Sequence, residues 1–367
     1  MNKELSELLA LAETRAASDV HLSEGDVPRL RMVGDLVRLE DHAVLTHAQL
    51  EEIVDELGSF TLPADCDDAA AKVRAELLAQ GSIDGAMTSP SGGRYRFNLY
   101  RESDRLAVAL RRLDGRFRTF AELGLPPRLE SFASERDGLV IVTGPTGSGK
   151  STTLATLIDR INHTLDGHII TIEDPVEFIH RPARSLVHQR QVGRDTKSFN
   201  DALVEAMRQD PDVILVGEMR DLPTVRTALR AAETGHLVFS TLHAGDCAGA
   251  IERMISLYPA DEQPGARHQL SLVLRGIVAQ HLVIGTDTKR RHPAVEIMVN
   301  TSAVANLIAN ARSAQVYSQI EIGASQGMCT LEQSLAELVQ KGAIDANSAF
   351  AISRNPSILT ARLARKR

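Results

Sequence analysis

Residues 144–151 form a pattern that could bind the phosphates of a nucleotide. They match G-x-x-x-x-G-K-[ST] and consist of Gly144, Pro145, Thr146, Gly147, Ser148, Gly149, Lys150 and Ser151. An apolar run at 139–142 precedes them, and a helix is expected to begin at Lys150. In that context the backbone N–H groups face an anion, Lys150 contacts the outer phosphates, and the Ser151 hydroxyl ligates Mg²⁺. The sequence therefore predicts a nucleoside-triphosphate site, with a ligand-free glycine-rich turn as the alternative.

An acidic segment follows the apolar residues 168–172, which are expected to form a strand. It contains Glu173, Asp174 and Glu177. Phosphate sites in a parallel sheet lie at the carboxyl ends of its strands, so these carboxylates could hold the water shell of a metal ion or polarise an attacking water. A solvated acidic turn is the alternative, and the segment alone does not decide between them.

Two more apolar segments end in residues that could take part in phosphoryl transfer. Residues 213–216 are followed by Gly217 and Glu218, an order close to a Walker B strand with glycine at the usual position of the metal-binding aspartate. A carboxylate that orients the attacking water must lie within hydrogen-bond reach of it, and Glu218 is placed for that role. His243 follows the expected strand 237–240. It is either a packing residue or a further member of the site.

The composition is that of an ordinary folded protein. The chain has 367 residues, of which 43% are hydrophobic and 24% charged, so two domains are expected. The formal net charge of −7 offers no overall attraction to nucleic acid, and no nucleic-acid partner is expected. Cys66, Cys247 and Cys329 lie far apart, which favours reduced thiols in a cytoplasm. The most apolar later segment, 270–284, is interrupted by polar residues and is too short to span a membrane.

Local patterns divide the chain into two parts. In the first part we expect helices near 5–12 and 47–57 and strands at 18–22, 29–32, 36–39, 94–100 and 106–110, with a hairpin turn at 33–35. Beyond a linker at 113–136, buried strands alternate with helices, as in a parallel sheet that is covered on both faces. The expected strands are 139–142, 168–172, 213–216 and 237–240, and the expected helices are 152–161, 199–208 and 222–233.

Four segments in this order resemble the motifs of a known family. Residues 144–151, 172–177, 213–221 and 234–244 resemble the Walker A, Asp-box, atypical Walker B and His-box motifs of the secretion ATPase superfamily. The resemblance is strongest to its PilT branch, the hexameric motors that retract type IV pili, and includes 18–22, 122–126 and 323–328. It implies an α/β fold: a smaller α+β (PAS-like) N-terminal domain at 1–112, followed by a RecA-like P-loop NTPase domain at 137–367 with a C-terminal helical region.

The resemblance also implies roles for individual residues. Residues 144–151 and Thr152 bind the nucleotide, with Lys150 on the phosphates and Ser151 on the metal. Glu177 becomes an Asp-box carboxylate at the metal, Glu218 the catalytic glutamate, and His243 a sensor of the γ-phosphate. Arginines of the N-terminal domain contact the phosphates, and the residues at the matching positions are Arg94, Arg96, Arg105 and Arg111. At least one of these four is expected to solvate an exposed strand face instead.

A chain of this family is expected to hydrolyse ATP with Mg²⁺ as a homo-hexamer. It would drive twitching motility by retracting a type IV pilus, as a peripheral protein at the cytoplasmic face of the bacterial inner membrane. Its expected partners are an inner-membrane platform protein and a paralogous pilus ATPase. An accessory motor subunit similar to PilU and a type II secretion or pilus assembly ATPase remain alternatives. The latter usually carries a four-cysteine insertion, whereas this chain has three cysteines.

One segment departs from the family pattern. PilT-like motors carry the helix motif Ala-Ile-Arg-Asn-Leu-Ile-Arg, and residues 303–309 align with it, with Ala305 and Ala309 in place of both arginines. The apolar spacing is kept, so the helix is expected to pack, whereas a methyl group cannot replace the forked donors of arginine. The sequence therefore predicts a motor that hydrolyses ATP but couples hydrolysis to retraction differently.

Overall fold

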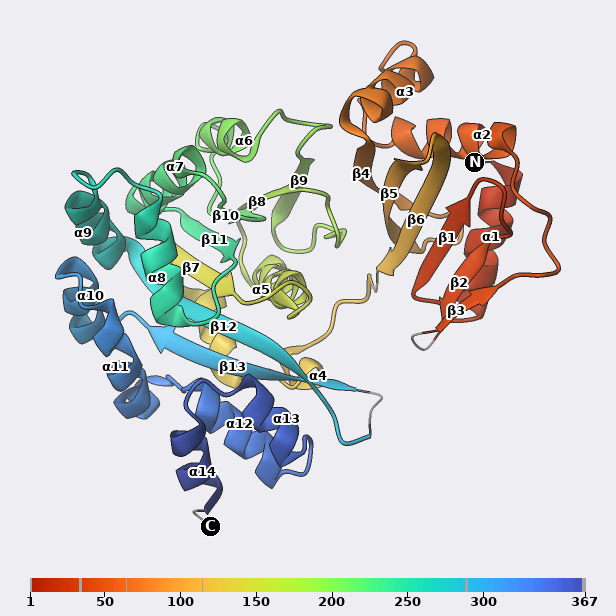
Figure 1. The fold of residues 1–367 in the computed structure, drawn as a ribbon. Coiled ribbons are helices and arrows are strands. Elements are labelled where there is room, and N and C mark those ends of the chain that lie inside the picture. Colours follow the sequence, from red (N-terminus) through yellow and green to blue (C-terminus); the bar gives the residue numbers. More distant parts are fainter. Residues whose placement is uncertain (1, 33–34, 64, 114, 288–289, 365–367) are drawn as a thin grey trace. The chain divides into compact units, whose positions relative to one another are not determined.

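The computed structural model describes residues 2–32, 35–63, 65–113, 115–287 and 290–364. The chain divides into two compact units, which are described separately (Figure 1). Unit 1 comprises Met1–Arg116, Glu173–Ile179 and Gln189–Ser198, and unit 2 comprises Phe117–Ile172, His180–His188 and Phe199–Arg367. The hairpin turn expected at 33–35 lies mostly outside the described residues. Across the described ranges, every helix is too short or too polar to cross a bilayer.

Unit 1 is built on a six-stranded antiparallel sheet in the order β3-β2-β1-β6-β5-β4. The strands are β1 (Asp19–Ser23), β2 (Arg29–Met32), β3 (Asp35–Arg38), β4 (Ser82–Thr88), β5 (Arg94–Glu102) and β6 (Arg105–Leu113). The helices are α1 (Lys3–Thr14), α2 (His47–Ser59) and α3 (Ala69–Gln80). α2 begins at His47 because Thr46 and Gln49 form a capping box with the first backbone N–H groups.

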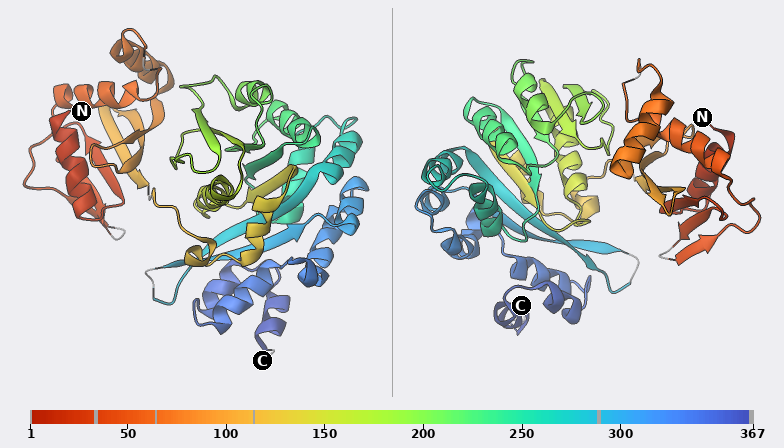
Figure 2. Two further views of the ribbon diagram at one scale, coloured as in Figure 1. Left: turned by 180° about the vertical axis from the view of Figure 1, so that it is seen from behind. Right: turned by 45° about the horizontal axis from the view of Figure 1, so that its top comes forward.

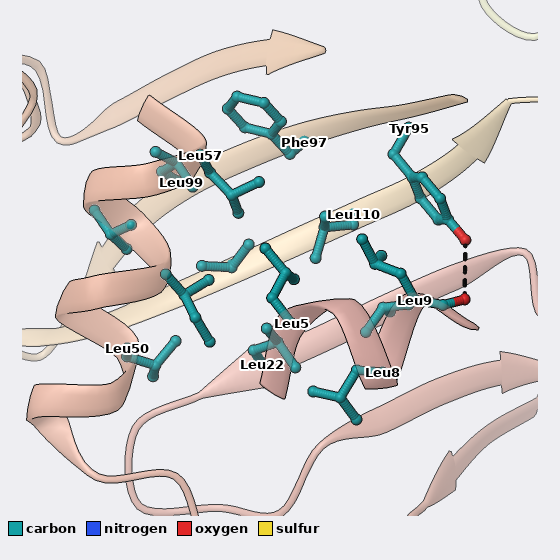
Figure 3. Close-up of a cluster of buried hydrophobic side chains, with 14 of the residues drawn as sticks. Leu5, Leu8, Leu9, Leu22, Leu50, Leu57, Tyr95, Phe97, Leu99 and Leu110 are labelled. Atoms are coloured by element: carbon teal, nitrogen blue, oxygen red, sulfur yellow. Dashed lines mark hydrogen bonds between the residues drawn. The ribbon is translucent and has the colours of Figure 1, made fainter. Parts of the chain in front are cut away.

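One face of this sheet carries the core of unit 1. The buried side chains drawn in Figure 3 come from α1, α2 and the sheet and include Leu5, Leu8, Leu9, Leu22, Leu50, Leu57, Tyr95, Phe97, Leu99 and Leu110. Tyr95 donates its hydroxyl to the Leu9 carbonyl at 3.3 Å. Side chains alternate along a strand, so Arg94 and Arg96 lie on the face opposite Tyr95.

Apart from the ends of β8 and β9, unit 2 contains a seven-stranded sheet in the order β13-β12-β7-β11-β10-β8-β9. The strands are β7 (Gly138–Thr143), β8 (His168–Glu173), β9 (Leu186–Gln191), β10 (Val213–Val216), β11 (Leu237–Leu242), β12 (Leu274–Ile284) and β13 (Arg291–Val299). The five central strands β12, β7, β11, β10 and β8 run parallel to one another, and β13 is antiparallel to β12. β7, β10 and β11 are buried along their whole length, as expected for strands covered on both faces.

Helices cover both faces of this sheet (Figure 1). The helices of unit 2 are α4 (Phe120–Leu123), α5 (Lys150–Thr164), α6 (Phe199–Ala206), α7 (Leu222–Glu233), α8 (Cys247–Ser256), α9 (Gln263–Val273), α10 (Ser302–Ala309), α11 (Val316–Ile322), α12 (Leu331–Gln340), α13 (Ala346–Ile352) and α14 (Pro356–Ala364). Short 3-10 helices are η1 (Pro127–Ser134), η2 (Ser313–Gln315) and η3 (Gly323–Gln326). Near the C-terminus, α12 packs against β13 and α13 against β12 (Figure 2).

One expectation from the sequence differs from this arrangement. The linker expected at 113–136 is shorter, because residues from Phe117 onward belong to unit 2. Phe120, Leu129 and Phe132 of that segment are buried in the core of unit 2, so their apolar side chains hold it there. The apolar segment 270–284 forms the end of α9 and the strand β12.

Candidate functional site

The glycine-rich loop connects β7 to α5, and α5 begins at Lys150 as expected from the sequence. Gly144 has a φ of 144°, and a Cβ there would lie 2.3 Å from the backbone oxygen of Gln280. Gly149 precedes α5 with a φ of 89°, in the left-handed region that favours glycine. The loop therefore requires glycine at these positions, for close packing at the first and for the turn into the helix at the second.

The N-terminus of α5 is suited to bind an anion. Its N-cap residue is Gly149, which has no side chain to cap the first turn, so a phosphate can take the place of a capping group there. Lys150 is 9% exposed, and its Nζ donates to the carbonyls of Gly144 and Pro145 at 2.9 and 3.0 Å. Ser151 is exposed and Thr152 is half-buried. The ammonium group thus lies within the loop, where a phosphate would meet it.

Gln280 holds this loop from the neighbouring strand β12, and the sequence did not single it out. Its Nε2 donates to the Ser148 carbonyl at 2.7 Å, and its Oε1 accepts the Thr153 hydroxyl at 2.7 Å. The side chain is 3% exposed, so both hydrogen bonds are shielded from water. The one signal in the sequence was a polar residue within an apolar run, which served only as an argument against a membrane span.

Glu218 lies in a turn after β10 that its neighbours hold in place. The Gly217 N–H donates to the Ile172 carbonyl of β8 at 2.8 Å, and the Thr241 hydroxyl of β11 donates to the Gly217 carbonyl at 2.6 Å. The Met219 N–H donates to the Thr241 carbonyl at 3.2 Å. The sheet thus fixes the backbone on both sides of the carboxylate.

Two basic side chains flank the Glu218 carboxylate. Arg220 Nε lies 2.6 Å from Oε1, and His243 Nε2 lies 3.7 Å from Oε2. The Glu218 side chain is 14% exposed. Burial lowers the pKa of His243 below its usual value, and the positive charge of Lys150 lowers this pKa further. The structure therefore brings Glu218 and His243 together, and it adds Arg220, which the sequence did not suggest.

The loop that carries His243 is also bonded to the end of β7. The Ala244 N–H donates to the Thr143 hydroxyl at 2.8 Å, and that hydroxyl lies 2.8 Å from the Ala244 carbonyl. Thr143 directly precedes Gly144 of the phosphate loop. The phosphate loop and the 243–246 loop consequently share one edge of the sheet.

The remaining predicted site residues belong to unit 1. Glu177 is half-buried, and Arg94 donates to the neighbouring Val176 carbonyl at 2.7 Å. Burial lowers the pKa of Arg94. Arg96 lies 3.7 Å from the carboxylate of Asp84.

Arg111 and Arg105 lie on β6 of the same unit. Arg111 donates its Nε to Asp19 at 2.8 Å and is directly opposite Arg96 in the sheet, whereas Arg105 is exposed at the start of the strand. Since these residues belong to unit 1, their predicted contact with a nucleotide on unit 2 stays a prediction, as does that of Glu177.

Comparison with known proteins gives a family and close relatives. The family model Type II/IV secretion system protein matches residues 106–349. The chain is 42% identical to the Pseudomonas aeruginosa protein named Type IV pilus retractation ATPase PilT, over 94% of this chain and 97% of that protein. It is 34% identical to Type IV pilus ATPase PilU of the same species, over 95% of this chain and 88% of that protein. A solved structure of the pilus retraction motor PilT with bound ADP is similar with a TM-score of 0.86 at 40% identity, covering 97% of this chain and 99% of that one.

Proposed function

Because the chain belongs to the type II/IV secretion system protein family, we propose that it is an ATP-hydrolysing motor that drives retraction of type IV pili. The observation that carries the proposal is a complete phosphate loop at the same sheet edge as the Glu218 and His243 pair. The ADP bound by the solved PilT supports a nucleotide at 144–151 here. The 42% identity to the Pseudomonas aeruginosa PilT over nearly the whole chain supports pilus retraction as the function.

The residues present fit a nucleotide with Mg²⁺. The uncapped first turn of α5 offers N–H groups to a phosphate. The exposed hydroxyl of Ser151 is an oxygen ligand of the kind that Mg²⁺ takes, and Glu177 is the second proposed ligand. When bound, Mg²⁺ neutralises charge on the phosphate oxygens.

Several side chains then have separate roles in ATP hydrolysis. Glu218 orients the attacking water and accepts its proton, while Lys150 exchanges the loop carbonyls for phosphate oxygens. His243, neutral at pH 7 because its pKa is lowered, donates or accepts one hydrogen bond at the outer phosphate. Arg111 and its neighbours on β5 and β6 supply positive charge from unit 1, so that hydrolysis depends on the approach of the two units.

We further propose that six copies form a ring, because a motor must pass the movement of one subunit to the next. Its partner is then a platform protein of the bacterial inner membrane, which the ring meets from the cytoplasmic face as a peripheral protein. The relatives named PilT and PilU occur in one species, which supports a paralogous ATPase as a further partner.

A second candidate is an accessory motor similar to PilU. The observation in its favour is α10, where Ala305 and Ala309 stand at the positions of the two family arginines. The chain is 34% identical to PilU and 42% identical to PilT, which favours the retraction motor.

Turnover of ATP by the purified chain tests the proposal. Lys150→Ala removes the point charge that offsets phosphate oxygens, so hydrolysis should be abolished while the fold is kept. The matched control is Lys341→Ala, since that lysine is 71% exposed on a different helix end. Mg²⁺ dependence is measured by chelation and re-addition. Undiminished turnover by a folded Lys150→Ala variant would exclude the assignment of the phosphate loop.

A further inference from the structure

The 243–246 loop is held by the C-terminal helices as well as by the sheet. Asp246 begins α8 as its N-cap and accepts the Gly249 N–H. The same carboxylate forms an ion pair with Arg354, which lies in the turn between α13 and α14. The Arg354 guanidinium also lies against Gly245, where an added Cβ would be 2.2 Å from its Nη2. One side chain from the C-terminal region thus contacts two consecutive residues of the loop that carries His243.

The backbone of Arg354 is itself anchored by a buried carboxylate. Glu332, at the start of α12, is 1% exposed. It accepts the N–H groups of Arg354 and Asn355 at 3.1 and 3.0 Å and the Ser353 hydroxyl at 3.2 Å. Its second oxygen accepts the Tyr317 hydroxyl at 3.0 Å. A buried carboxylate with four donors fixes the 353–355 turn firmly, so Arg354 projects from a rigid base.

A second buried carboxylate connects α8 to α12. Glu296 of β13 is 4% exposed and accepts the Cys247 N–H at the start of α8 at 2.9 Å. It also accepts the Leu331 N–H at the start of α12. The contacts therefore close into a ring that runs from the loop through Arg354 and Glu332 to α12, and back through Glu296 to α8.

We propose that Arg354 is a positioning residue for ATP hydrolysis, which holds the 243–246 loop so that His243 stays beside Glu218. The inference rests on the proposed function, because it assigns Arg354 to the same site. Docking of α12, α13 and α14 on the sheet then sets the geometry of the catalytic pair. The Arg354 and Asp246 side chains are 45% and 26% exposed, so the ion pair contributes little to folding stability, and its effect should appear in turnover.

The test uses four variants of the full chain. Arg354→Ala removes the ion pair and the contact with Gly245, and Arg354→Lys keeps only the charge. Asp246→Asn removes the charge but keeps the helix cap, because asparagine caps as well as aspartate. Both Arg354→Ala and Asp246→Asn should lower kcat about fivefold with a smaller change in KM for ATP. The double variant should be no slower than either single variant, and Arg354→Lys should recover part of the loss.

Amide hydrogen exchange supplies a readout that does not depend on activity. Exchange at residues 243–249 should increase in Arg354→Ala and Asp246→Asn but not in the control Arg362→Ala, which breaks the ion pair between Arg362 of α14 and Glu321 at 3.5 Å. Unchanged kcat, additive losses in the double variant, or equal loosening of the loop in Arg362→Ala would each overturn the inference. A parent chain without turnover would refute the proposed function instead, and loop exchange would still decide whether Arg354 holds the loop.

Discussion

Glu218 and His243 follow two adjacent parallel strands, and His243 Nε2 lies 3.7 Å from Glu218 Oε2. The register of β10 and β11 produces this distance, since Val216 is paired with Ser240 and the two side chains follow two and three residues later. A carboxylate and a neutral imidazole at that separation can act on the same water and phosphate. Substitutions in this pair can therefore separate nucleotide binding from ATP hydrolysis.

Glu218→Gln should lower the rate of ATP hydrolysis while leaving nucleotide binding nearly unchanged. The amide keeps the size and the hydrogen-bonding capacity of the side chain but cannot accept the proton, so kcat should fall by about 100-fold or more. Affinity for ADP should stay within a few-fold of the parent. Both are measured by steady-state turnover and by titration with a fluorescent ADP. A joint loss of affinity, turnover and thermal stability would instead identify Glu218 as a structural carboxylate.

The lowered pKa of His243 predicts a pH dependence of stability. The pKa of this histidine is about 6.5 in the unfolded chain and lower in the folded chain. At pH values between these two pKa values, the unfolded state therefore binds more protons than the folded state. The contribution of neutral His243 to the free energy of unfolding is therefore present above pH 6.5, and it is lost as the pH falls through the pKa of the folded state. Urea unfolding from pH 8 to pH 5 should show a steeper loss for the parent than for His243→Gln. Parallel curves would contradict the shift.

The sequence predicted the parts of the site that follow strands directly. β7, β8, β10 and β11 are apolar runs with polar residues at their ends, and such runs are identified by composition alone. The strand β12 was missed, because a long apolar run with interspersed polar residues does not distinguish a buried strand from a helix. Gln280 and Arg354 were missed for another reason. Their partners are 127 and 108 residues away in the chain, and only the folded topology brings them together.

Gln280→Leu should loosen the phosphate loop. Leucine fills a similar volume but leaves the Ser148 carbonyl and the Thr153 hydroxyl without their buried partner, at a cost of about 1–3 kcal/mol in the free energy of unfolding. ATP affinity should weaken as well, because the loop backbone that faces the phosphates is no longer fixed. Thr153→Val provides the matched variant, since it removes only one of the two bonds and should have the smaller effect. Parent-like ATP affinity in Gln280→Leu would show that the loop keeps its shape without Gln280.

Arg111→Ala tests whether unit 1 contributes to catalysis. If Arg111 neutralises charge on the transferred phosphate, kcat should fall much more than ADP affinity. Asp19→Asn is the matched control, because it removes the charge partner of Arg111 but keeps the guanidinium. Its turnover should stay close to that of the parent. Equal turnover of Arg111→Ala and the parent would show that Arg111 has no part in catalysis and only pairs with Asp19 on the sheet surface.

The two alanines of α10 give the last prediction. Val304, Leu307 and Ile308 are buried, so the helix packs as its apolar spacing predicts, while Ala305 and Ala309 are only half-buried. Arginine at these two positions therefore has room at the surface, and its absence removes polar contacts without disturbing the core. We expect the unmodified chain to hydrolyse ATP but to restore little twitching in a strain that lacks its own retraction ATPase.

The double variant Ala305→Arg plus Ala309→Arg should restore more twitching at the same rate of ATP hydrolysis. Twitching is scored as the spread of colonies, and turnover is measured on the purified proteins. The control is the double variant Ala305→Gln plus Ala309→Gln, which adds length and polarity but neither the charge nor the fork of arginine. Full twitching by the unmodified chain would show that α10 transmits movement without these arginines. Coupling would then have to pass through the apolar face of α10, where it packs against α9.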